Sequence, residues 1–343
     1  MSVSKLRVLG LVHRHLMPPE VVPEGTDLVA APWRTEYDVI TTLRKLGHEV
    51  QPLGVHDDLG DIRRTAEEWK PHIAFNLLEA FDDITIFDQN VVSHLELLKL
   101  SYTGCNPRGL LLARDKSLSK KLLAYHRIPV PEFDVFRVGR PIKLSKKRAY
   151  PLIVKSLTQE ASIGISQASV VDSDEKLKER VHFIHQSIGT AAIVEQYVEG
   201  RELYVGIVGN QTLQSLPVWE LYFNDMPEGA RRIATDRVKW SVKYQKKYGI
   251  DSGPAKDLPE AVCEKIQHVC KRTYRALEMS GYARIDLRLD GTGKVWVIEA
   301  NPNPQIAKGE DFADSAEKAG ISYESLLQRI VNLGLRWQPE SVA

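Results

Sequence analysis

The sequence contains few cysteines and no long hydrophobic run. Only Cys105, Cys263 and Cys270 occur among its 343 residues, and no two of them form a C-x-x-C pair. This excludes a disulfide scaffold and a cysteine-rich zinc module, and it is typical of proteins in a reducing cytoplasm. No apolar run approaches the roughly 18 residues that a membrane-spanning helix needs. The N-terminal residues predict a strand rather than a signal peptide, so we expect a cytoplasmic protein.

The sequence also lacks an excess of charge of one sign and the two best-known nucleotide-binding motifs. The 46 basic and 45 acidic residues leave a net charge of +1, so no global field favours nucleic acid or an anionic membrane. No G-x-x-x-x-G-K-[ST] occurs, which excludes a Walker-type phosphate loop. The absence of G-x-G-x-x-G likewise argues against a Rossmann dinucleotide site.

Short apolar strands alternate with amphipathic helices in the first third of the chain. The strands are expected at residues 6–12, 49–53 and 72–77, and the helices at 35–47 and 87–100. This alternation predicts an α/β unit with a parallel sheet, covering residues 1–112.

The rest of the chain predicts two α+β units, at 113–202 and 203–343. The expected elements are helices at 116–125 and 172–186, strands at 151–155, 191–197 and 202–208, a helix opened by Asp257 and Pro259, and a last helix at 323–333. Residues 224–254 form a polar stretch that is long for a structureless loop, which indicates a functional or mobile segment.

The most informative segment lies near the C-terminus. Two strands flank the turn signal Asp290-Gly291, and an antiparallel hairpin in that register brings Asp286 close to Glu299 and Asn301. Two carboxylates and an amide oxygen on one sheet face are ligands that Mg²⁺ prefers. Arg284 falls on the same face, where it could meet a developing negative charge. The alternative is a surface hairpin with ordinary charges.

Candidate nucleotide-binding residues stand upstream of this hairpin. Lys155 ends an apolar strand and could reach a phosphate, although exposed lysines are common. Ser162 lies in a segment of small residues whose N–H groups could approach phosphates. The acidic side chains of Glu195 and Glu202 could accept hydrogen bonds from an adenine and a ribose; the alternative is a solvated strand end.

Taken together, these residues resemble a known family. The ordered set that carries the resemblance is Lys116, Lys155, Glu195, Glu202, Asp286, Glu299 and Asn301. It is similar to the ATP-grasp superfamily, and most of all to its D-alanine–D-alanine ligase branch, over nearly the whole chain. Further similar segments are residues 101–104 with Asp115, Lys116 and Lys120, the pair Lys243-Tyr244, and the helix start at 35–39 that contains Glu36.

The resemblance implies a fold and a reaction. The fold would be an N-terminal pre-ATP-grasp domain followed by two α+β subdomains that clasp ATP. The reaction would be ADP-forming: a carboxylate takes a phosphoryl group from ATP, and an amine attacks the acyl phosphate. The implied partners are therefore small molecules, with no nucleic acid and no membrane, and a homodimer stays open.

The same resemblance implies a role for each matched residue. Lys116, Lys155 and Ser162 would hold phosphates, and Lys243, next to Tyr244, would reach the γ-phosphate. Glu195, Gln196, Tyr197 and Val198 would bind adenine, and Glu202 the ribose. Asp286, Glu299 and Asn301 would hold two Mg²⁺ ions, with Mn²⁺ as an alternative, and Arg284 would stabilise the tetrahedral oxyanion. Glu36 would meet a substrate amine.

The acceptor side departs from the D-alanine ligase pattern. Ala161 stands where those enzymes carry a substrate-orienting serine, and Pro302-Asn303-Pro304-Gln305-Ile306 replaces a glycine-containing substrate loop. Asn76 and Glu79 replace a His-Gly stretch, and could contact substrate or cap a strand. Asn303 and Gln305 are the further substrate candidates. We therefore expect an amino acid or small peptide-like acid as substrate, not D-alanine.

The sequence also allows other interpretations. An ATP-dependent kinase would use the same nucleotide site, and a nucleotide-gated binding protein would explain an altered acceptor side. His13 and His15 follow the first strand, where α/β sheets place ligands. Two histidines alone make a poor metal site.

Overall fold

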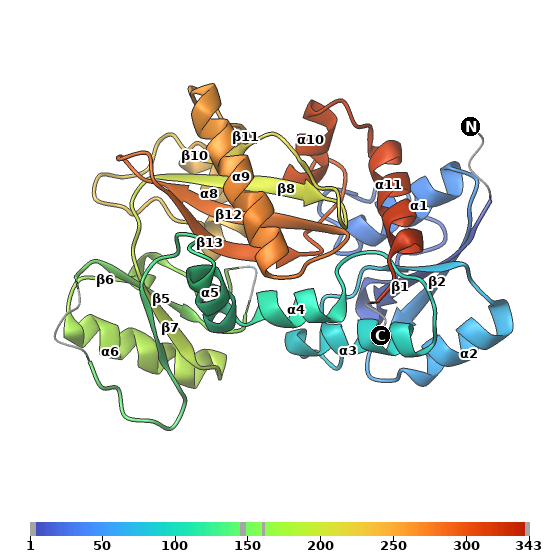
Figure 1. The fold of residues 1–343 in the computed structure, drawn as a ribbon, viewed down its shortest axis with the longest axis horizontal. Helices are drawn as coiled ribbons and strands as arrows, with labels where there is room; N and C mark the ends of the chain where they lie inside the picture. Colours follow the sequence, from blue (N-terminus) through green and yellow to red (C-terminus); the bar gives the residue numbers. More distant parts are fainter. Residues whose placement is uncertain (1–4, 145–148, 160–161, 340–343) are drawn as a thin grey trace.

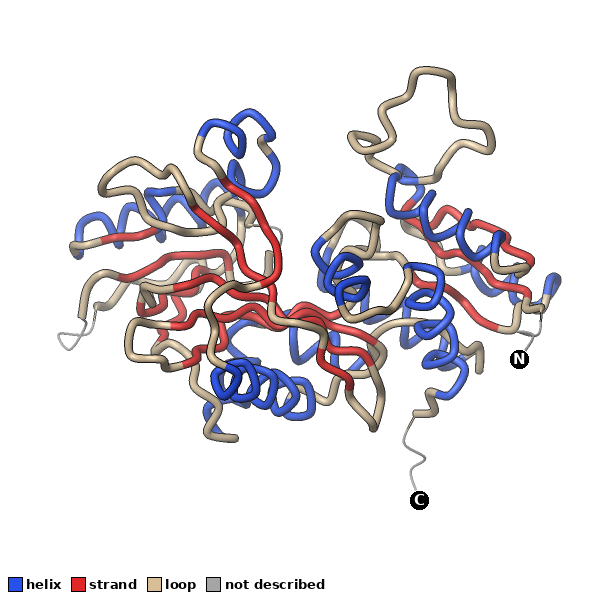
Figure 2. Tube along the Cα trace, turned by 90° about the horizontal axis from the view of Figure 1, so that it is seen from above, coloured by secondary structure: helices blue, strands red, loops and turns tan. Residues whose placement is uncertain are grey.

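The computed structural model describes residues 5–144, 149–159 and 162–339. Its strands form three sheets, of three, four and six strands, which follow one another along the chain. Figure 1 shows the first sheet beside α1 and α2, and the other two stacked at the opposite end of the molecule. The strands in Figure 2 accordingly form a small group near the N-terminus and a larger group elsewhere.

The first sheet is parallel, as predicted, with strand order β2-β1-β3. Its strands are β1 (Arg7–His13), β2 (Glu49–Val55) and β3 (Ile73–Asn76). The helices of this part are α1 (Arg34–Lys45), α2 (Gly60–Trp69), α3 (Asp88–Leu97) and α4 (Pro107–Arg114), with 3₁₀ turns η1 (Arg14–Leu16) and η2 (Thr85–Phe87). Because the strands are parallel, their carboxyl ends meet at one edge of the sheet.

Two helices of this part were not expected from the sequence. Helix α2 has an apolar stripe of Ile62, Ala66 and Trp69 that packs against the largest core, so its spacing was a helix signal that the prediction missed. Helix α4 begins with Asn106, whose side chain accepts a hydrogen bond from Gly109 N at 2.9 Å, followed by Pro107 at the first helical position. That Asn-Pro pair is a recognisable helix start.

The second sheet is antiparallel, with strand order β4-β7-β5-β6. Its strands are β4 (Phe133–Phe136), β5 (Leu152–Ser156), β6 (Val170–Val171) and β7 (Ala192–Gln196). The accompanying helices are α5 (Lys116–Tyr125), η3 (Gln167–Ser169), α6 (Asp174–Phe183) and its π-helical continuation η4 (Ile184–Ile188). Apolar residues of β5, β7 and α6 form a separate small core.

The third sheet has the order β11-β10-β8-β12-β13, and β9 pairs with β8. Its strands are β8 (Arg201–Val208), β9 (Gln214–Ser215), β10 (Trp219–Phe223), β11 (Ile250–Pro254), β12 (Tyr282–Leu289) and β13 (Val295–Pro302). Residues 224–254 are therefore not wholly irregular, since they contain α7 (Asp236–Trp240), α8 (Val242–Lys247) and β11. The remaining helices are α9 (Glu260–Ala276), α10 (Asp311–Lys318) and α11 (Tyr323–Arg336).

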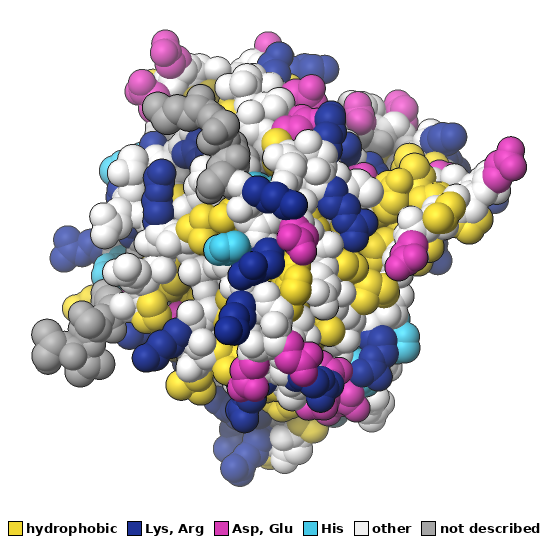
Figure 3. All heavy atoms as spheres, turned by 90° about the vertical axis from the view of Figure 1, so that its right-hand side faces the viewer, with side chains coloured by type: hydrophobic (Ala, Val, Ile, Leu, Met, Phe, Trp, Pro, Cys, Tyr) yellow, Lys and Arg dark blue, Asp and Glu magenta, His cyan; other side chains and the backbone are white. Residues whose placement is uncertain are grey.

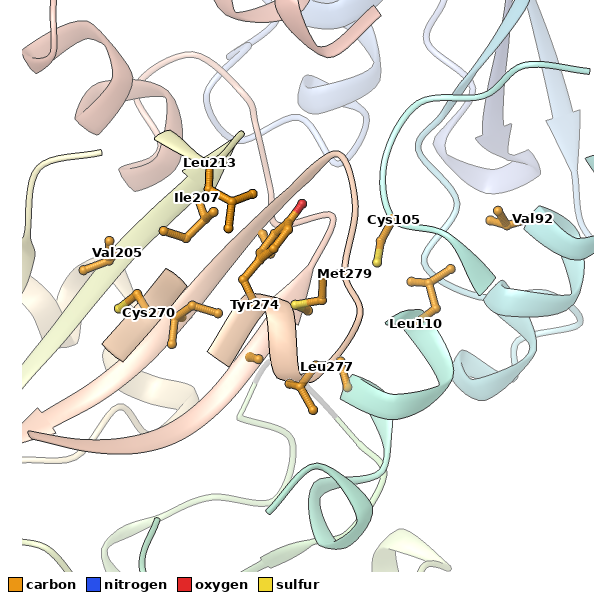
Figure 4. Packing of buried hydrophobic residues seen from close by; sticks show 14 of the residues in the cluster. Val92, Cys105, Leu110, Val205, Ile207, Leu213, Cys270, Tyr274, Leu277 and Met279 are labelled. Carbon is orange, nitrogen blue, oxygen red and sulfur yellow. The ribbon is translucent and has the colours of Figure 1, made fainter. Parts of the chain in front are cut away.

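The chain parts are joined by shared hydrophobic cores. The largest core runs from the first sheet through α4 to α9 and the third sheet. Figure 4 shows Tyr274 of α9 and Leu277, which directly follows α9, between the β8 side of this core and Leu110 of α4. Helix α11 returns to the N-terminal part, where Leu327 and Ile330 belong to the same core as Val39 of α1.

The face of the molecule drawn in Figure 3 shows no field of one sign. On the face drawn in Figure 3, basic and acidic side chains are interspersed, in keeping with the balanced composition. Among residues 5–144, 149–159 and 162–339, no helix combines the length and the apolar character needed to cross a membrane.

Candidate active site

The hairpin of β12 and β13 forms the predicted constellation. Asp286 lies directly opposite Glu299, and Arg284 lies opposite Asn301. A register irregularity follows Asp286, at the step to Leu287. The Arg284 guanidinium donates to both carboxylate oxygens of Asp286, at 2.8 and 2.9 Å. The sequence register was therefore correct, and the four polar side chains share one face.

Nearby cationic side chains stabilise the negative charges of the carboxylates on this face. Desolvation raises the pKa of Asp286 above its usual range, and Arg284 acts against that change. Desolvation also acts to raise the pKa of Glu299, but three nearby lysines, of which Lys116 acts most strongly, together outweigh it and lower that pKa to about 2. Lys116 Nζ lies 2.8 Å from Glu299 Oε1. Glu299 is therefore ionised at neutral pH and available to a cation.

The residues fit a divalent ion that prefers oxygen ligands. Asp286 and Glu299 are withdrawn from water, with side-chain exposures of 13 and 24%. Within the described part of the chain, Asn301 Nδ2 is buried with no hydrogen-bond partner, so nothing there fixes its amide. A cation coordinated by the Asn301 oxygen would fix that amide and would offset the desolvation of both carboxylates. Mg²⁺ is the expected ion for this donor set.

A cavity between the second and third sheets contains the predicted nucleotide residues. It encloses about 840 Å³, including its open mouth. Its lining includes all eight of them: Lys116, Lys155, Ser162, Glu195, Gln196, Tyr197, Val198 and Glu202. Ile153 and Ile233 add apolar walls, which suit the faces of a purine ring. We refer to this space as the nucleotide cavity.

The acidic side chains of this cavity are already paired. Glu195 is buried, and its carboxylate lies 3.1 Å from Lys155 Nζ and 3.4 Å from Lys120 Nζ. Glu202 lies 2.6 Å from the Arg288 guanidinium. Glu195 therefore lies between two lysines, and its Oε1 has no hydrogen-bond partner among the described residues. Arg288 was missed because its role depends on the facing strand β8.

The phosphate-loop candidate is tied to the segment before α7. Ser162 has a positive φ of 63°, and its Oγ donates to Ala234 O at 2.7 Å. Gly164 follows with a φ of 73°. Two left-handed residues so close together curve the chain tightly over the cavity. Ala161, singled out in the sequence, lies outside the described residues.

A second and wider cavity opens on the other side of the carboxylates. Its lining includes the five predicted substrate residues: Glu36, Asn76, Glu79, Asn303 and Gln305. Arg284 and Asn301 also face it. Asp286, Glu299 and Lys239 line both cavities, so they form the partition between them. We refer to this second space as the acceptor cavity.

Two of these substrate candidates make structural hydrogen bonds. Asn303, with a φ of 49°, accepts from Cys105 N at 2.8 Å through its Oδ1. Asn76 accepts from Leu78 N at 3.2 Å. Both side chains fix the cavity wall as well as facing it. Glu36 is different, because it is 4% exposed and its Oε2 has no hydrogen-bond partner among the described residues. Its burial raises the pKa of Glu36 to about 7.

The lysine expected at the γ-phosphate is not brought to either cavity. Lys243 is exposed on α8, and Tyr244 packs against Tyr248 with ring centroids 4.6 Å apart. Lys239 on α7 instead faces both Asp286 and Glu299, and acts to lower the pKa of each. Sequence reasoning missed Lys239 because several basic residues crowd this segment. Buried Val238 orients α7, and Gln245 Nε2 donates to Val238 O at 2.9 Å and to Lys239 O at 3.1 Å.

Comparison with known proteins places these observations in a family. A family model described as D-ala D-ala ligase C-terminus matches residues 122–332. The D-alanine–D-alanine ligase of Desulforudis audaxviator is 30% identical over 86% of this chain and 90% of its own. An uncharacterized protein of Sinorhizobium fredii, y4sG, is 29% identical over 95% of this chain and 94% of its own.

Solved structures show the same fold. The D-alanine–D-alanine ligase of Bacillus anthracis complexed with ATP aligns with a TM-score of 0.75 at 22% identity. That match covers 96% of this chain and 98% of the other. The ligase of Coxiella burnetii aligns with a TM-score of 0.67 at 16% identity, covering 97% and 94% of the two chains. These alignments confirm the predicted α/β architecture of the ATP-grasp type.

Proposed function

Since the chain belongs to the D-alanine–D-alanine ligase family, we propose that it is an ATP-dependent, ADP-forming ligase that joins a carboxylate to an amine through an acyl phosphate. One observation carries this proposal. Asp286, Glu299 and Lys239 line the nucleotide cavity and the acceptor cavity alike. A phosphoryl group passing between two substrates needs cations on both sides of the transfer.

The chain's own residues divide the work between the two cavities. Lys116 and Lys155 bind phosphates, and residues 196–198 bind the adenine edge while Glu202 meets the ribose. Mg²⁺ held by Asp286, Glu299 and Asn301 would neutralise charge on the phosphates. Lys239 faces the same carboxylates and is placed for the transferred phosphoryl group. Arg284 stabilises the oxyanion that forms when the amine attacks.

The acceptor cavity favours an amine as the second substrate. Its lining is rich in carboxylates from separate elements: Glu36, Glu79, Asp83, Asp251, Glu310 and Asp311. Such a wall attracts a cationic ammonium group. Glu36 is the best placed of them to take a proton from it, because one of its oxygens is buried without a partner in the described structure and its pKa is raised to about 7.

We propose an amino acid or small peptide-like acid other than D-alanine as the carboxylate substrate. The loop at 302–306 carries two prolines and, through Asn303, is bonded to Cys105 N. The loop has no glycine whose bare N–H could approach a carboxylate closely. We place the reaction in the cytoplasm, where the three free cysteines stay reduced.

The test is ADP release by the full chain with ATP, Mg²⁺ and pooled amino acids, D-alanine included. Mass spectrometry of the product identifies the reaction, since a condensation product has lost water. A product that gains a phosphoryl group instead would identify a kinase and sink the proposal. Folded protein that binds ATP but releases no ADP with any acid–amine pair would argue for a binding protein. Formation of D-alanyl-D-alanine at a rate above all other pairs would overturn the substrate assignment alone.

A further inference from the structure

A group of histidines lies outside the proposed reaction centre, at the carboxyl edge of the first sheet. His13 ends β1, and His56 directly follows Val55, which is paired with His13 in the neighbouring strand β2. His15 lies in the 3₁₀ turn after β1. The ring centroids of the three imidazoles are 5.3 to 5.7 Å apart. Parallel strand ends therefore gather three residues that the sequence separates by up to 43 positions, from 13 to 56.

A carboxylate from a third segment completes the group. Asp83 Oδ1 lies 3.4 Å from His13 Nε2, and Asp83 Oδ2 lies 3.3 Å from His56 Nε2. One ligand atom from each of these three residues falls within 4.8 Å of the others. Asp82 N donates to His56 O at 2.8 Å, which fixes the turn that carries Asp83 against β2. The sequence alone showed only two histidines, so the third imidazole and the carboxylate are structural findings.

The outer nitrogen of His56 has a partner of its own. Asp57 Oδ1 lies 3.5 Å from His56 Nδ1, while Nε2 faces Asp83. A carboxylate behind the free ring nitrogen is the arrangement that orients metal-bound histidines and makes them better ligands.

We propose that His13, His56 and Asp83 bind a divalent transition-metal ion of the Zn²⁺ class, with one coordination position open to the acceptor cavity. Two imidazoles and a carboxylate favour Zn²⁺ or Co²⁺ over the Mg²⁺ that suits the all-oxygen set of the hairpin. The open position follows from the location, because His13 and Asp83 both line the acceptor cavity. Three protein ligands with a fourth position free characterise zinc sites that bind or activate a ligand.

The ion would orient a donor group of the substrate in the acceptor cavity. A carboxylate, amine or imidazole of the substrate could fill the free position, and the metal would then select acids that carry such a group. Metal binding here does not depend on the ligase reaction. Failure of one is therefore distinguishable from failure of the other.

Co²⁺ titration of the full chain tests the site directly, with millimolar Mg²⁺ present to occupy the hairpin. We expect one Co²⁺ per chain with visible absorption bands, displaced by Zn²⁺. His56→Ala and Asp83→Asn should each weaken binding at least about tenfold. His268→Ala removes an exposed histidine on α9 and should bind as the wild type does. Circular dichroism confirms that each variant is folded. Non-saturable binding, or equal affinity in all variants, would overturn the proposal.

Two further measurements examine parts of the proposal separately. Azide should change the Co²⁺ spectrum by entering the free position, and an unchanged spectrum would overturn the open coordination. Imidazole ¹⁵N resonances need no variant. On adding Zn²⁺, the resonances of His13 and His56 should move while those of remote residues such as His268 stay, and shifts confined to other histidines of the ten would contradict the assignment.

Discussion

Arg284 and Asp286 lie two residues apart on β12 and are joined by two hydrogen bonds, at 2.8 and 2.9 Å. The Arg284 guanidinium also stands over the Tyr204 ring, 4.8 Å from its centroid. A carboxylate and an aromatic ring thus hold one cation at the wall of the acceptor cavity. A donor held in place before the reaction is the arrangement that stabilises a developing oxyanion.

Replacing Arg284 with Met should therefore reduce turnover more than nucleotide affinity. We expect kcat to fall by about 10² to 10³, the usual effect of losing an oxyanion donor. ATP affinity, measured by calorimetry, should stay close to that of the wild type because Arg284 does not line the nucleotide cavity. Arg275→Met, on the exposed face of α9, is the control. Unchanged turnover in R284M would show that Arg284 is not the oxyanion donor.

Lys239 should carry the role that the sequence assigned to Lys243. Lys239→Met removes the cation shared by both cavities, so we expect kcat to fall by about 10² or more. Lys246→Met, exposed on α8, serves as the control with unchanged activity. ADP release measures all variants. If Lys243→Met lost activity and Lys239→Met kept it, the original assignment would be restored.

Glu36 should make the stability of the protein depend on pH. Its pKa is about 7 in the folded chain against an ordinary value of 4.5, so the folded state binds a proton more tightly than the unfolded chain does. The stability that this proton contributes is fully present below pH 4.5 and is lost as the pH rises through about 7. The free energy of unfolding of Glu36→Gln, measured relative to that of wild type, should rise by on the order of 3 kcal/mol between pH 4.5 and pH 8.

Urea unfolding at the two pH values measures this difference. Glu49→Gln, at the exposed start of β2, is the control and should show no such gain. An ammonium substrate would stabilise the ionised form of Glu36. At pH 8, the substrate should therefore raise the free energy of unfolding more in wild type than in E36Q. If the free energies of unfolding of E36Q and wild type differed by the same amount at both pH values, Glu36 would be solvated in the folded protein.

Lys120 should support the nucleotide cavity through the fold rather than through contact with ATP. It is 2% exposed, donates to Ile298 O at 2.8 Å and lies 3.4 Å from Glu195. Lys120→Met should lower the free energy of unfolding by about 3 kcal/mol, because it leaves buried acceptors short of a partner. Its exposed neighbour gives the control, and Lys121→Met should change stability by less than about 0.5 kcal/mol.

A double variant separates the charge interaction from the loss of packing. Lys120→Met with Glu195→Gln should be less destabilised than the sum of the two single changes, since the residues are in contact. Strict additivity in chemical denaturation would mean that the two charges do not interact.

ATP with Mg²⁺ should close two segments over the nucleotide cavity. The hydrogen bond from Ser162 Oγ to Ala234 O already joins the loop after β5 to the segment before α7. We expect slower hydrogen exchange in residues 156–166 and 224–254 on nucleotide binding, and no change in α9. Ser162→Ala should weaken the protection of 224–254. Equal exchange in both segments with and without ATP would contradict closure.

The parts of the site that the sequence predicted are those set by local spacing. The register that opposes Asp286 and Glu299 follows from strand alternation and one turn, and the two residues are only 13 positions apart in the chain. The first sheet could likewise be predicted from the sequence, because apolar strands alternate there with amphipathic helices. Helix α2 carries a stripe of the same kind, formed by Ile62, Ala66 and Trp69, and could have been predicted in the same way.

What the sequence did not predict depends on distant contacts. Lys239 faces the carboxylates because buried Val238 orients a five-residue helix, a decision made by tertiary packing. The return of α11 to α1 is likewise set by which apolar faces remain uncovered. His56 and Asp83 join His13 only through the order of parallel strands. No periodicity within a single segment carries that information.

The 2.8 Å pair between Lys116 and Glu299 has a consequence for how the site fills. In this state Lys116, the proposed phosphate ligand, is the counterion of Glu299, the proposed metal ligand. Nucleotide binding alone would move Lys116 to a phosphate and leave the desolvated Glu299 carboxylate without a counterion. Metal binding alone would displace Lys116 from Glu299 while no phosphate is present to pair with it. When both ligands bind, the metal pairs with Glu299 and the phosphate pairs with Lys116. Their affinities are coupled, and by thermodynamic reciprocity the factor by which Mg²⁺ tightens ATP equals the factor by which ATP tightens Mg²⁺.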